Sequence, residues 1–301
     1  MNTRPGAPIV VGVDGSPPSL VAVETAVAEA ALRHRGLRIV HAFTWPPAAA
    51  ATTPGLTGSA QRMSWEQAEH HLAEATRIAD KCAPDVTTTA EMITGPAAPV
   101  LLDESRGAAL LVLGDRGLGG LTELLIGSVA CHTTTHAHCP VIVVRGDSRL
   151  DGPVVAGVDG SATSALALDF AAEEAALRGT DLVTVHAWGG GDSTDLNADL
   201  PMTYEFWSGE EEEKRVLAEA VAGLAERHPD LRIRQQARRG SARRMLTGWS
   251  RTAQLVVVGN RGHGGFTGLL LGSVSQYLIH HAGCPVAVVR PGLSETDQPS
   301  A

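Results

Sequence analysis

The chain contains the same sequence pattern twice, with the second copy about 145 residues after the first. The segment Val-Asp-Gly-Ser at 13–16 returns at 158–161. The same offset relates His41 to His186, Gly95 to Gly240, Gly114 to Gly259 and Cys139 to Cys284. A repeat this long corresponds to two domains rather than to the short units of a solenoid. We expect these domains to span residues 1–147 and 153–292.

Within each copy, short β-branched runs alternate with longer helical stretches, which is typical of βαβ units around a parallel sheet. The run Leu110 to Leu113 is apolar on both pleat faces, as a strand covered by helices on both sides requires. Strands are predicted at 8–13, 37–42, 86–93, 109–114 and 140–145, and again near 153–158, 181–187, 231–238, 254–259 and 285–290. Helices are predicted in the first copy at 19–33, 59–82, 97–106 and 128–137.

Composition limits the class of protein. A chain of 301 residues with 44% apolar content can bury two cores of ordinary domain size. Its net charge of -9 argues against binding to nucleic acid or to an anionic membrane surface. No apolar run reaches the roughly 20 residues that a membrane helix needs, and the first residues lack the apolar stretch of a signal peptide. We therefore expect a soluble, cytoplasmic protein with no membrane segment and no nucleic-acid partner.

A glycine motif follows the fourth predicted strand of each copy. Gly114-Asp115-Arg116-Gly117 precedes nine residues and then Gly127-Ser128, and Gly259 to Ser273 repeats this spacing. Glycines permit tight turns and close approach of the backbone to a ligand. The helix that begins near Gly127 offers unpaired N–H groups and a positive dipole end to a phosphate. Alternatively, the glycines only shape a turn and the serine is an N-cap.

Two observations favour a nucleotide site over simple turn chemistry. The motif occurs twice in one chain, and each copy has an aspartate, Asp14 or Asp159, at the end of the first strand. Other nucleotide motifs are absent, because neither a P-loop nor a G-x-G-x-x-G element occurs, and the nucleophile elbow G-x-S-x-G is also missing.

With these motifs, both halves resemble the universal stress protein family over the whole chain. The resemblance implies two tandem Rossmann-like domains of the adenine nucleotide α-hydrolase-like type. Each would hold a five-stranded parallel sheet in the order 3-2-1-4-5, sandwiched by helices. It further implies one ATP per domain, with adenine at the end of the second strand and Mg²⁺ on the phosphates, and a homodimer. Asp14 and Asp159 match the family's acidic residue near adenosine and the metal-bound phosphates.

The expected ATP-binding residues follow from the motif and from this resemblance. In the first copy they are Gly12, Asp14, Ala42, Gly114, Arg116, Gly117, Gly127, Ser128 and Val129. In the second copy they are Gly157, Asp159, Ala187, Gly259, Arg261, Gly262, Gly272, Ser273 and Val274. Copy one has Asp115 where copy two has Asn260, and a carboxylate beside phosphates is repulsive unless it faces away or meets a cation. Arg116 and Arg261 could pair with phosphate or lie in solvent.

No general base stands at a recognisable spacing from the glycine loop, so no catalytic residue is predicted. A nucleotide-dependent stress-response regulator with little or no hydrolysis is therefore favoured. A slow ATPase or ATP-using enzyme of the adenine nucleotide α-hydrolase-like superfamily is the alternative, and an empty structural dimeriser is a third class. The stretch His132, His136, His138 and Cys139 also raises a metal site as a minor alternative to exposed or packing histidines.

Two long connections, 43–58 and 188–209, leave the second strand of each copy. Loops of this length are usually functional or disordered. We expect them to cover the nucleotide site or to contact a partner, with Trp45, Trp188 and Trp207 as anchors.

Overall fold

The chain forms two compact α/β units, the first ending at Val144 and the second spanning Arg145–Pro291. The computed structural model describes residues 6–45, 57–118, 126–147, 149, 151–189, 204–262 and 271–291, with the side chains of 57–61 and 204–209 left out. The domain limits expected from the sequence, 1–147 and 153–292, stay a prediction, because their outer ends lie outside these residues.

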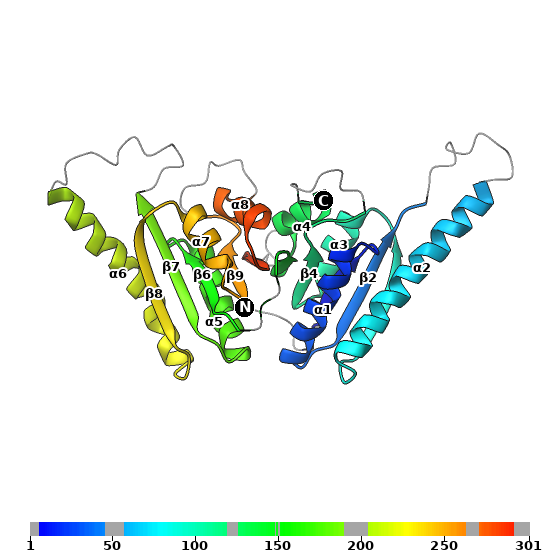
Figure 1. Ribbon diagram of the computed structural model, residues 1–301, viewed down its shortest axis with the longest axis horizontal. Helices are drawn as coiled ribbons and strands as arrows, with labels where there is room; N and C mark the ends of the chain where they lie inside the picture. The colour runs from blue at the N-terminus through cyan, green and yellow to red at the C-terminus, as the bar shows by residue number, and fades with distance from the viewer. Residues whose placement is uncertain are drawn as a thin grey trace, which may run out of the picture. The chain divides into compact units, whose positions relative to one another are not determined.

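The first unit is a parallel sheet of five strands in the order β3-β2-β1-β4-β5, with helices on both faces (Figure 1). Helix α1 packs on α2, and α3 packs on α4. Its elements are β1 (Ile9–Val13), α1 (Pro17–Leu32), β2 (Leu37–Phe43), α2 (Thr57–Cys82), β3 (Thr88–Thr94), α3 (Ala97–Ser105), β4 (Leu110–Gly114), α4 (Ser128–His136) and β5 (Val141–Val144).

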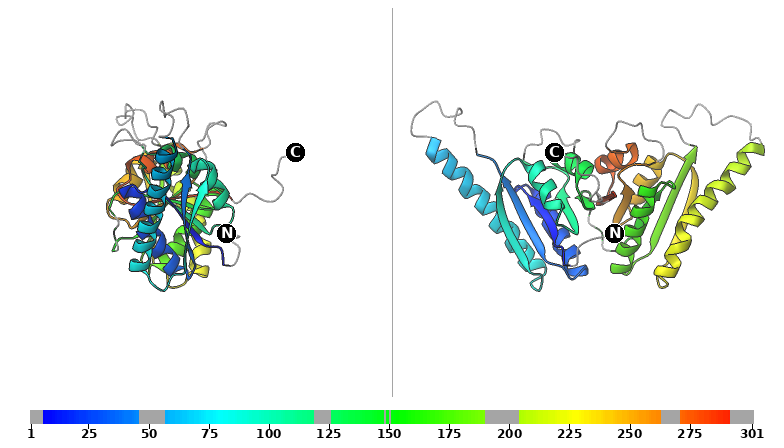
Figure 2. Two further views of the ribbon diagram at one scale, coloured as in Figure 1. Left: turned by 90° about the vertical axis from the view of Figure 1, so that its right-hand side faces the viewer. Right: turned by 180° about the vertical axis from the view of Figure 1, so that it is seen from behind.

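The second unit repeats this arrangement in the order β8-β7-β6-β9-β10, and the view from behind shows the same layers (Figure 2). The predicted sheet order is therefore confirmed in both copies. Its elements are β6 (Val154–Val158), α5 (Ala162–Leu177), β7 (Leu182–Gly189), α6 (Tyr204–Arg227), β8 (Ile233–Gly240), α7 (Ala242–Ser250), β9 (Leu255–Gly259), α8 (Ser273–His281) and β10 (Val286–Val289).

Strand β1 lies at the centre of the first sheet, because it pairs with β2 on one side and with β4 on the other. Val11 stands opposite both Ile39 and Val112. Ile9, Leu110 and Leu111 are fully buried, as expected for strands covered on both faces. Burying each such side chain contributes about 1.5–3 kcal/mol. This core fixes the carboxyl ends of β1, β2 and β4 at one edge of the sheet.

Helix α1 begins at Pro17, two residues before the predicted start at Ser19. Ser16 is the N-cap, and its side chain accepts a hydrogen bond from the Ser19 N–H at 3.4 Å. Proline suits the first helical position because its fixed φ matches the helix and its missing N–H needs no partner there. Copy two keeps the cap, with Ser161 accepting from the Ser164 N–H at 3.1 Å.

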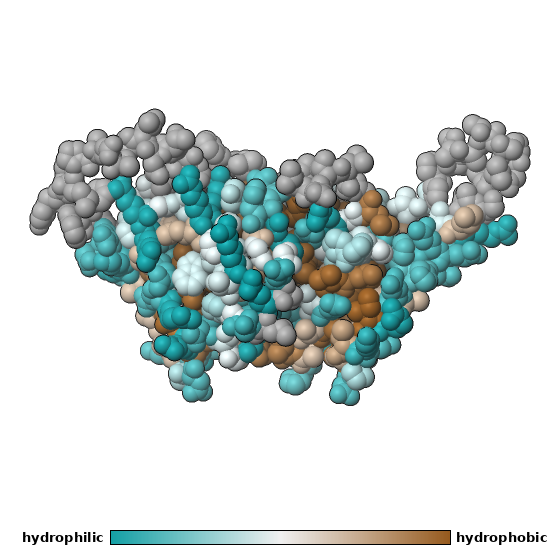
Figure 3. Space-filling view, viewed as in Figure 1, coloured by the Kyte–Doolittle hydropathy of each residue, from teal (hydrophilic) through white to brown (hydrophobic). Residues whose placement is uncertain are grey.

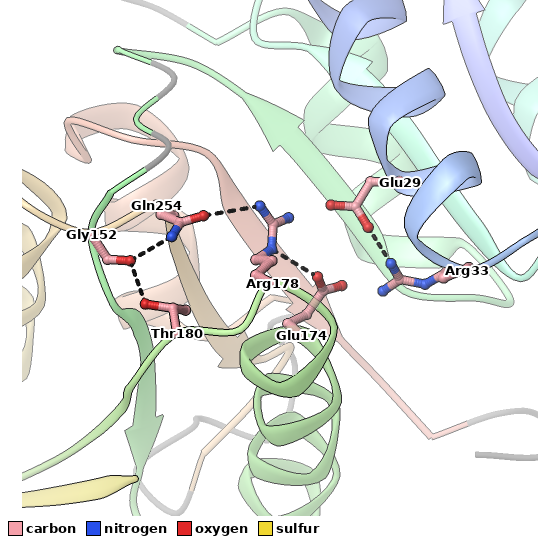
Figure 4. A network of polar contacts seen from close by, with 7 residues as sticks. All are labelled: Glu29, Arg33, Gly152, Glu174, Arg178, Thr180 and Gln254. Atoms are coloured by element: carbon pink, nitrogen blue, oxygen red, sulfur yellow. Dashed lines mark hydrogen bonds and ion pairs between the residues drawn. The ribbon is translucent and has the colours of Figure 1, made fainter. Parts of the chain in front are cut away.

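Each first helix ends in an ion pair whose carboxylate is buried. Arg178 Nε lies 3.1 Å from Glu174 Oε2, and the Glu174 side chain is 0% exposed. Glu29 and Arg33 form the same i,i+4 pair in copy one (Figure 4). In copy two, the Arg178 guanidinium also donates to Gln254, whose amide donates to the Gly152 carbonyl at 2.6 Å. This network ties the end of α5 to the chain segments that lead into β6 and β9.

Among the residues that the structure describes, no helix has the length and apolarity needed to cross a membrane. The central parts of both long connections, 46–56 and 190–203, lie outside the described residues, and so the expected covering role of 43–58 and 188–209 stays a prediction. At the first of these connections, the Trp45 ring stacks on the Trp65 ring of α2, with 5.6 Å between centroids.

Candidate functional site

A cavity of about 460 Å³ opens at the carboxyl ends of β1, β2 and β4 in the first unit. This is where open parallel sheets bind ligands, because β2 and β4 flank β1 and the strand order reverses there. The N-terminus of α4 and one face of α3 complete the walls. The lining residues are Gly12, Val13, Asp14, Ser19, Val40, Ala42, Ala97, Leu101, Leu113, Gly114, Arg116, Gly117, Ile126, Gly127, Ser128, Val129 and Ala130.

All nine residues predicted for the first copy lie in this lining. They come from four separate segments of the chain, and the sheet brings them to one cavity. Gly12 and Asp14 are at β1, Ala42 is on β2, and Gly114 ends β4. What they bind stays a prediction, since their position alone does not identify a ligand.

The carboxylate of Asp14 lines the cavity and accepts hydrogen bonds from two separate segments of the chain. Its Oδ1 accepts hydrogen bonds from the Ser16 N–H at 3.0 Å and from the Ser16 hydroxyl at 2.6 Å. Its Oδ2 accepts from the Leu118 N–H at 2.8 Å. Burial opposes the ionised form, but the hydrogen bonds from Ser16, Leu118 and Ser19 outweigh it and lower the pKa of Asp14. The aspartate is therefore ionised at neutral pH and is a weak base.

Gly117 is required at its position by Asp14. A Cβ at Gly117 would lie 2.2 Å from Asp14 Oδ2, and a Cβ at Gly262 would lie 2.0 Å from Asp159 Oδ2. We expected these glycines to admit a ligand closely, but the neighbour that excludes a side chain is the aspartate of the same copy. Gly114 is constrained by the chain as well, because its Cβ would lie 2.7 Å from the Pro18 carbonyl carbon. The glycine loop is thus fitted to the start of α1.

The N-terminus of α4 faces the cavity through Gly127 to Ala130. The N-cap is Gly127, which has no side chain to cap the helix, and Ser128 is the first helical residue. The alternative in which Ser128 is the N-cap is therefore wrong, and the same holds for Ser273, which follows the N-cap Gly272. A helix start without a side-chain cap presents its first N–H groups and its positive dipole end to an anion.

Arg116 places a positive charge at the rim of the cavity. Its Nε lies 3.5 Å from Asp115 Oδ2. The expected repulsion between Asp115 and phosphates is therefore reduced, because this carboxylate meets a cation. Asp115 itself does not line the cavity.

An apolar wall of the cavity was absent from the sequence prediction. It includes Ala97 and Leu101 of α3, Leu113 of β4, and Ile126 and Ala130 beside the helix start. Ala97 and Leu101 are four residues apart and so share one face of α3. That spacing after the third strand is the signal that could have identified them.

The second copy arranges its predicted residues in the same way where the structure describes them. Gly157, Ala187 and Gly259 lie on β6, β7 and β9, and Asp159 Oδ1 accepts from the Ser161 N–H and hydroxyl at 3.0 and 2.6 Å. Arg261 and Gly262 follow β9, and Gly272, Ser273 and Val274 begin α8. Thr163, at the position of Pro18, donates to the Arg261 carbonyl at 2.6 Å. Residues 263–270 of this loop lie outside the described chain.

The histidines at the ends of the second strands differ between the copies. His41 is buried, and its ring centroid lies 5.8 Å from that of His71. Burial and the neighbouring His71 lower the pKa of His41. In copy two, His186 Nε2 lies 2.8 Å from Glu213 Oε2, and its Nδ1 lies 2.7 Å from the Val158 carbonyl oxygen.

The histidine-rich stretch forms a stacked pair on α4. The rings of His132 and His136 are 4.5 Å apart, and His136 Nδ1 lies 3.0 Å from the His132 carbonyl oxygen. Cys139 is buried, which raises the pKa of its thiol to about 12. Within the described part of the chain, no group of three potential metal ligands is close enough to hold an ion.

Comparison with known proteins shows that both copies match the same protein family. Residues 7–145 and 152–290 each match the sequence profile of the universal stress protein family. A universal stress protein of Mycolicibacterium smegmatis is 37% identical over 298 residues, covering 94% of this chain and 97% of that protein. One from Mycobacterium tuberculosis is 36% identical over 295 residues, covering 95% and 97%. The crystal structure of a universal stress protein from Archaeoglobus fulgidus has a TM-score of 0.70 at 18% identity, covering 95% and 98%, and so shares the fold.

Proposed function

Because the chain belongs to the universal stress protein family, we propose that it is a cytoplasmic, homodimeric stress-response regulator that binds one ATP per domain and hydrolyses it little or not at all. The observation that carries this proposal is the cavity of the first copy, which joins an apolar wall, a glycine loop and an uncapped helix start.

The cavity suits an adenine nucleotide in size and in chemistry. Its volume of about 460 Å³ falls within the range of small-molecule sites. Val40 and Ala42 of β2, with Leu101 of α3, offer an apolar end for the base. The helix start at Gly127 and the guanidinium of Arg116 offer donors for the phosphates.

A magnesium ion would accompany the phosphates. Magnesium is usually held by one or two carboxylates together with phosphate oxygens and water. Among the described lining residues, Asp14 is the one carboxylate, and its low pKa keeps it ionised. We propose that Asp14 and Asp159 support the metal-bound phosphates in their respective copies.

The geometry supports binding more than catalysis. Both oxygens of Asp14 already accept hydrogen bonds, and its lowered pKa makes it a poor proton acceptor. The enzymatic alternative requires steady release of phosphate or transfer to a second substrate. Measurement of phosphate release under excess ATP and Mg²⁺ separates the two functions, because the regulator turns over little or no nucleotide.

The decisive experiment is mass-resolved analysis of nucleotide released from freshly purified, acid-denatured protein. We expect close to two adenine nucleotides per chain in the wild type. Ala42→Phe fills the base end of the first cavity and should remove about one of them, and Ala187→Phe should remove the other.

Ala90→Phe serves as the matched control, because Ala90 is exposed on the neighbouring strand β3 and should leave the content unchanged. Wild-type protein that releases no nucleotide and shows no thermal shift with ATP and Mg²⁺ would overturn the proposal. The duplication would then be a dimerisation scaffold.

A further inference from the structure

The second copy carries a dense group of arginines on β8 and α7. Residues 231–251 hold seven arginines and no acidic residue, a net charge of +7. The equivalent residues of the first copy, 86–106, hold one arginine and three acidic residues, a net charge of -2. We call the group without Arg239, which points to the opposite side of β8 from Arg238, the arginine face; its members are Arg232, Arg234, Arg238, Arg243, Arg244 and Arg251.

The arginine face lies at the free edge of the second sheet. Strand β8 ends the strand order and pairs with β7. Arg234 and Arg238 stand opposite Val183 and Ala187, and so point to the same side of the sheet. Arg244 follows on α7 and is also exposed. Figure 3 shows hydrophilic side chains gathered over β8 and α7.

Part of this charge has no acidic partner in the portion of the chain that the structure describes. Arg234 pairs with Asp181 at 2.9 Å, and the guanidinium of Arg243 lies 5.6 Å from the centre of the Tyr277 ring. Within the described residues, Arg238, Arg244 and Arg251 form no ion pair.

At the equivalent edge of the first sheet, carboxylates neutralise the positive charge. Arg38 of β2 lies 2.8 Å from Glu91 of β3 and 2.6 Å from Glu104 of α3. The difference between the copies is therefore in charge pairing as well as in composition.

The guanidinium groups of the arginine face suit a ligand that carries a row of phosphate groups. Guanidinium groups pair with phosphate as planar, bidentate donors and stack on bases. Among the described residues, the large apolar side chains that are exposed, such as Trp45, Met63 and Leu118, lie outside β8 and α7. An apolar anchor for a membrane or for a protein partner is thus missing there. A flexible single strand can follow a surface built from a strand and a helix.

We propose that the arginine face binds the phosphate backbone of single-stranded nucleic acid. Our expectation of no nucleic-acid partner rests on the net charge of -9. Charges more than about 8 Å apart are largely screened at physiological salt, so the local surface decides whether contacts form. The negative charge on the rest of the molecule slows the association of nucleic acid, but it does not remove the contacts between arginine and phosphate.

Fluorescence anisotropy of the full chain with labelled single-stranded RNA and DNA of about 20 nucleotides tests this proposal, at salt from about 50 to 200 mM. The variant Arg238→Gln, Arg244→Gln, Arg251→Gln removes three exposed charges that have no acidic partner among the described residues. The control Arg62→Gln, Arg77→Gln, Arg106→Gln removes three exposed charges from the first copy, with the same change in net charge.

We expect the arginine-face variant to lose at least roughly tenfold in affinity and to lower the salt slope by about two, while the control stays within about twofold. Nucleotide content is measured for both variants as well, because Arg238 stands opposite Ala187, and an unchanged content separates loss of the arginine face from damage to the ATP site. Absence of binding to RNA and DNA at the lowest salt, or equal losses in both variants, would overturn the proposal. Labelled polyglutamate that binds through the same arginines when nucleic acid does not would identify an acidic protein partner instead.

Discussion

The edge strands β3 and β8 occupy equivalent places in the two copies but differ in charge. Strand β3 contributes Glu91, which neutralises Arg38, whereas β8 contributes Arg238 and Arg239 at the positions of Ile93 and Thr94. The glycine loops show the opposite behaviour. The hydrogen bonds from Ser16 to Asp14 and from Ser161 to Asp159 have the same lengths, 3.0 and 2.6 Å.

This contrast teaches which positions the fold itself constrains. A glycine that faces an aspartate cannot gain a side chain while that aspartate is present, and both copies retain the pair. An exposed side chain on an edge strand has few neighbours and can change freely. Similarity between the copies therefore marks packing and site geometry, and divergence marks surfaces on which each copy can acquire its own partner.

The largest expected effect concerns a feature that both copies share. Glu29→Gln and Glu174→Gln each remove a buried carboxylate from a half-buried arginine, and each should lower the free energy of unfolding by about 3 kcal/mol. Urea unfolding followed by circular dichroism measures the loss. Glu219→Gln, which breaks an exposed pair with Arg215, should cost less than about 1 kcal/mol. Equal losses in all three variants would show that burial of these pairs is unimportant.

The glycine loops provide the second test. Gly117→Ala places a Cβ against Asp14 Oδ2 and should destabilise the first copy by about 1–3 kcal/mol, and Gly262→Ala should do the same in the second. Asp14→Ala in the same chain as Gly117→Ala removes the clash. A double-mutant cycle should therefore give a coupling energy that offsets part of the loss. Additive losses would show that Asp14 is not what requires a glycine at 117.

Loss of the N-cap serine should destabilise the two copies by slightly different amounts. Ser161→Ala should cost about 1 kcal/mol in thermal unfolding, and Ser16→Ala slightly less, because the cap hydrogen bond is 3.1 Å in copy two and 3.4 Å in copy one. Ser16→Ala also removes a donor to Asp14 and so should raise the pKa of that carboxyl. Threonine at either position, which can still cap, should restore most of the stability. A larger loss at Ser16 than at Ser161 would contradict the ranking.

The smallest effect is a pH dependence of the first copy. The pKa of His41 in the folded protein is below its unfolded value, so the unfolded chain binds the proton more readily. Stability from this group is therefore complete above about pH 6.5 and is lost as the pH falls toward the lowered value. His41→Gln should reduce the difference in unfolding midpoint between about pH 7.5 and pH 5.5. An unchanged difference would assign the acid sensitivity to other groups.

The alternation of strands and helices in each copy predicted the parallel α/β class, and the resemblance to the universal stress protein family supplied the strand order that determines which strand ends meet. Asp14, Gly114 and Gly127 were predicted together and line one cavity. The apolar wall was not predicted, because Leu101 and Ile126 look like ordinary core residues until the sheet order places them beside the glycine loop. The role of Gly117 was also hidden, since its neighbour Asp14 is distant in sequence and adjacent only in the folded chain.

The arginine face was missed for a different reason. A net charge summed over the chain conceals local groups of one sign, and here the acidic residues elsewhere outweigh seven arginines within 231–251. Counting charge by copy and by element would have revealed it. Whether Arg238 has an ion-pair partner, however, depends on which side chains the fold places around it, and this requires coordinates.

The presence of the arginine face in one copy alone has a consequence for symmetry. A protein made of two identical single-domain chains would display any surface feature twice, related by the symmetry of the pair. Fusion of two copies into one chain removes that restriction, because each half can mutate separately. The present chain thus has a fixed ratio of two repeated glycine loops to one arginine face, a stoichiometry that a symmetric pair of identical domains cannot produce.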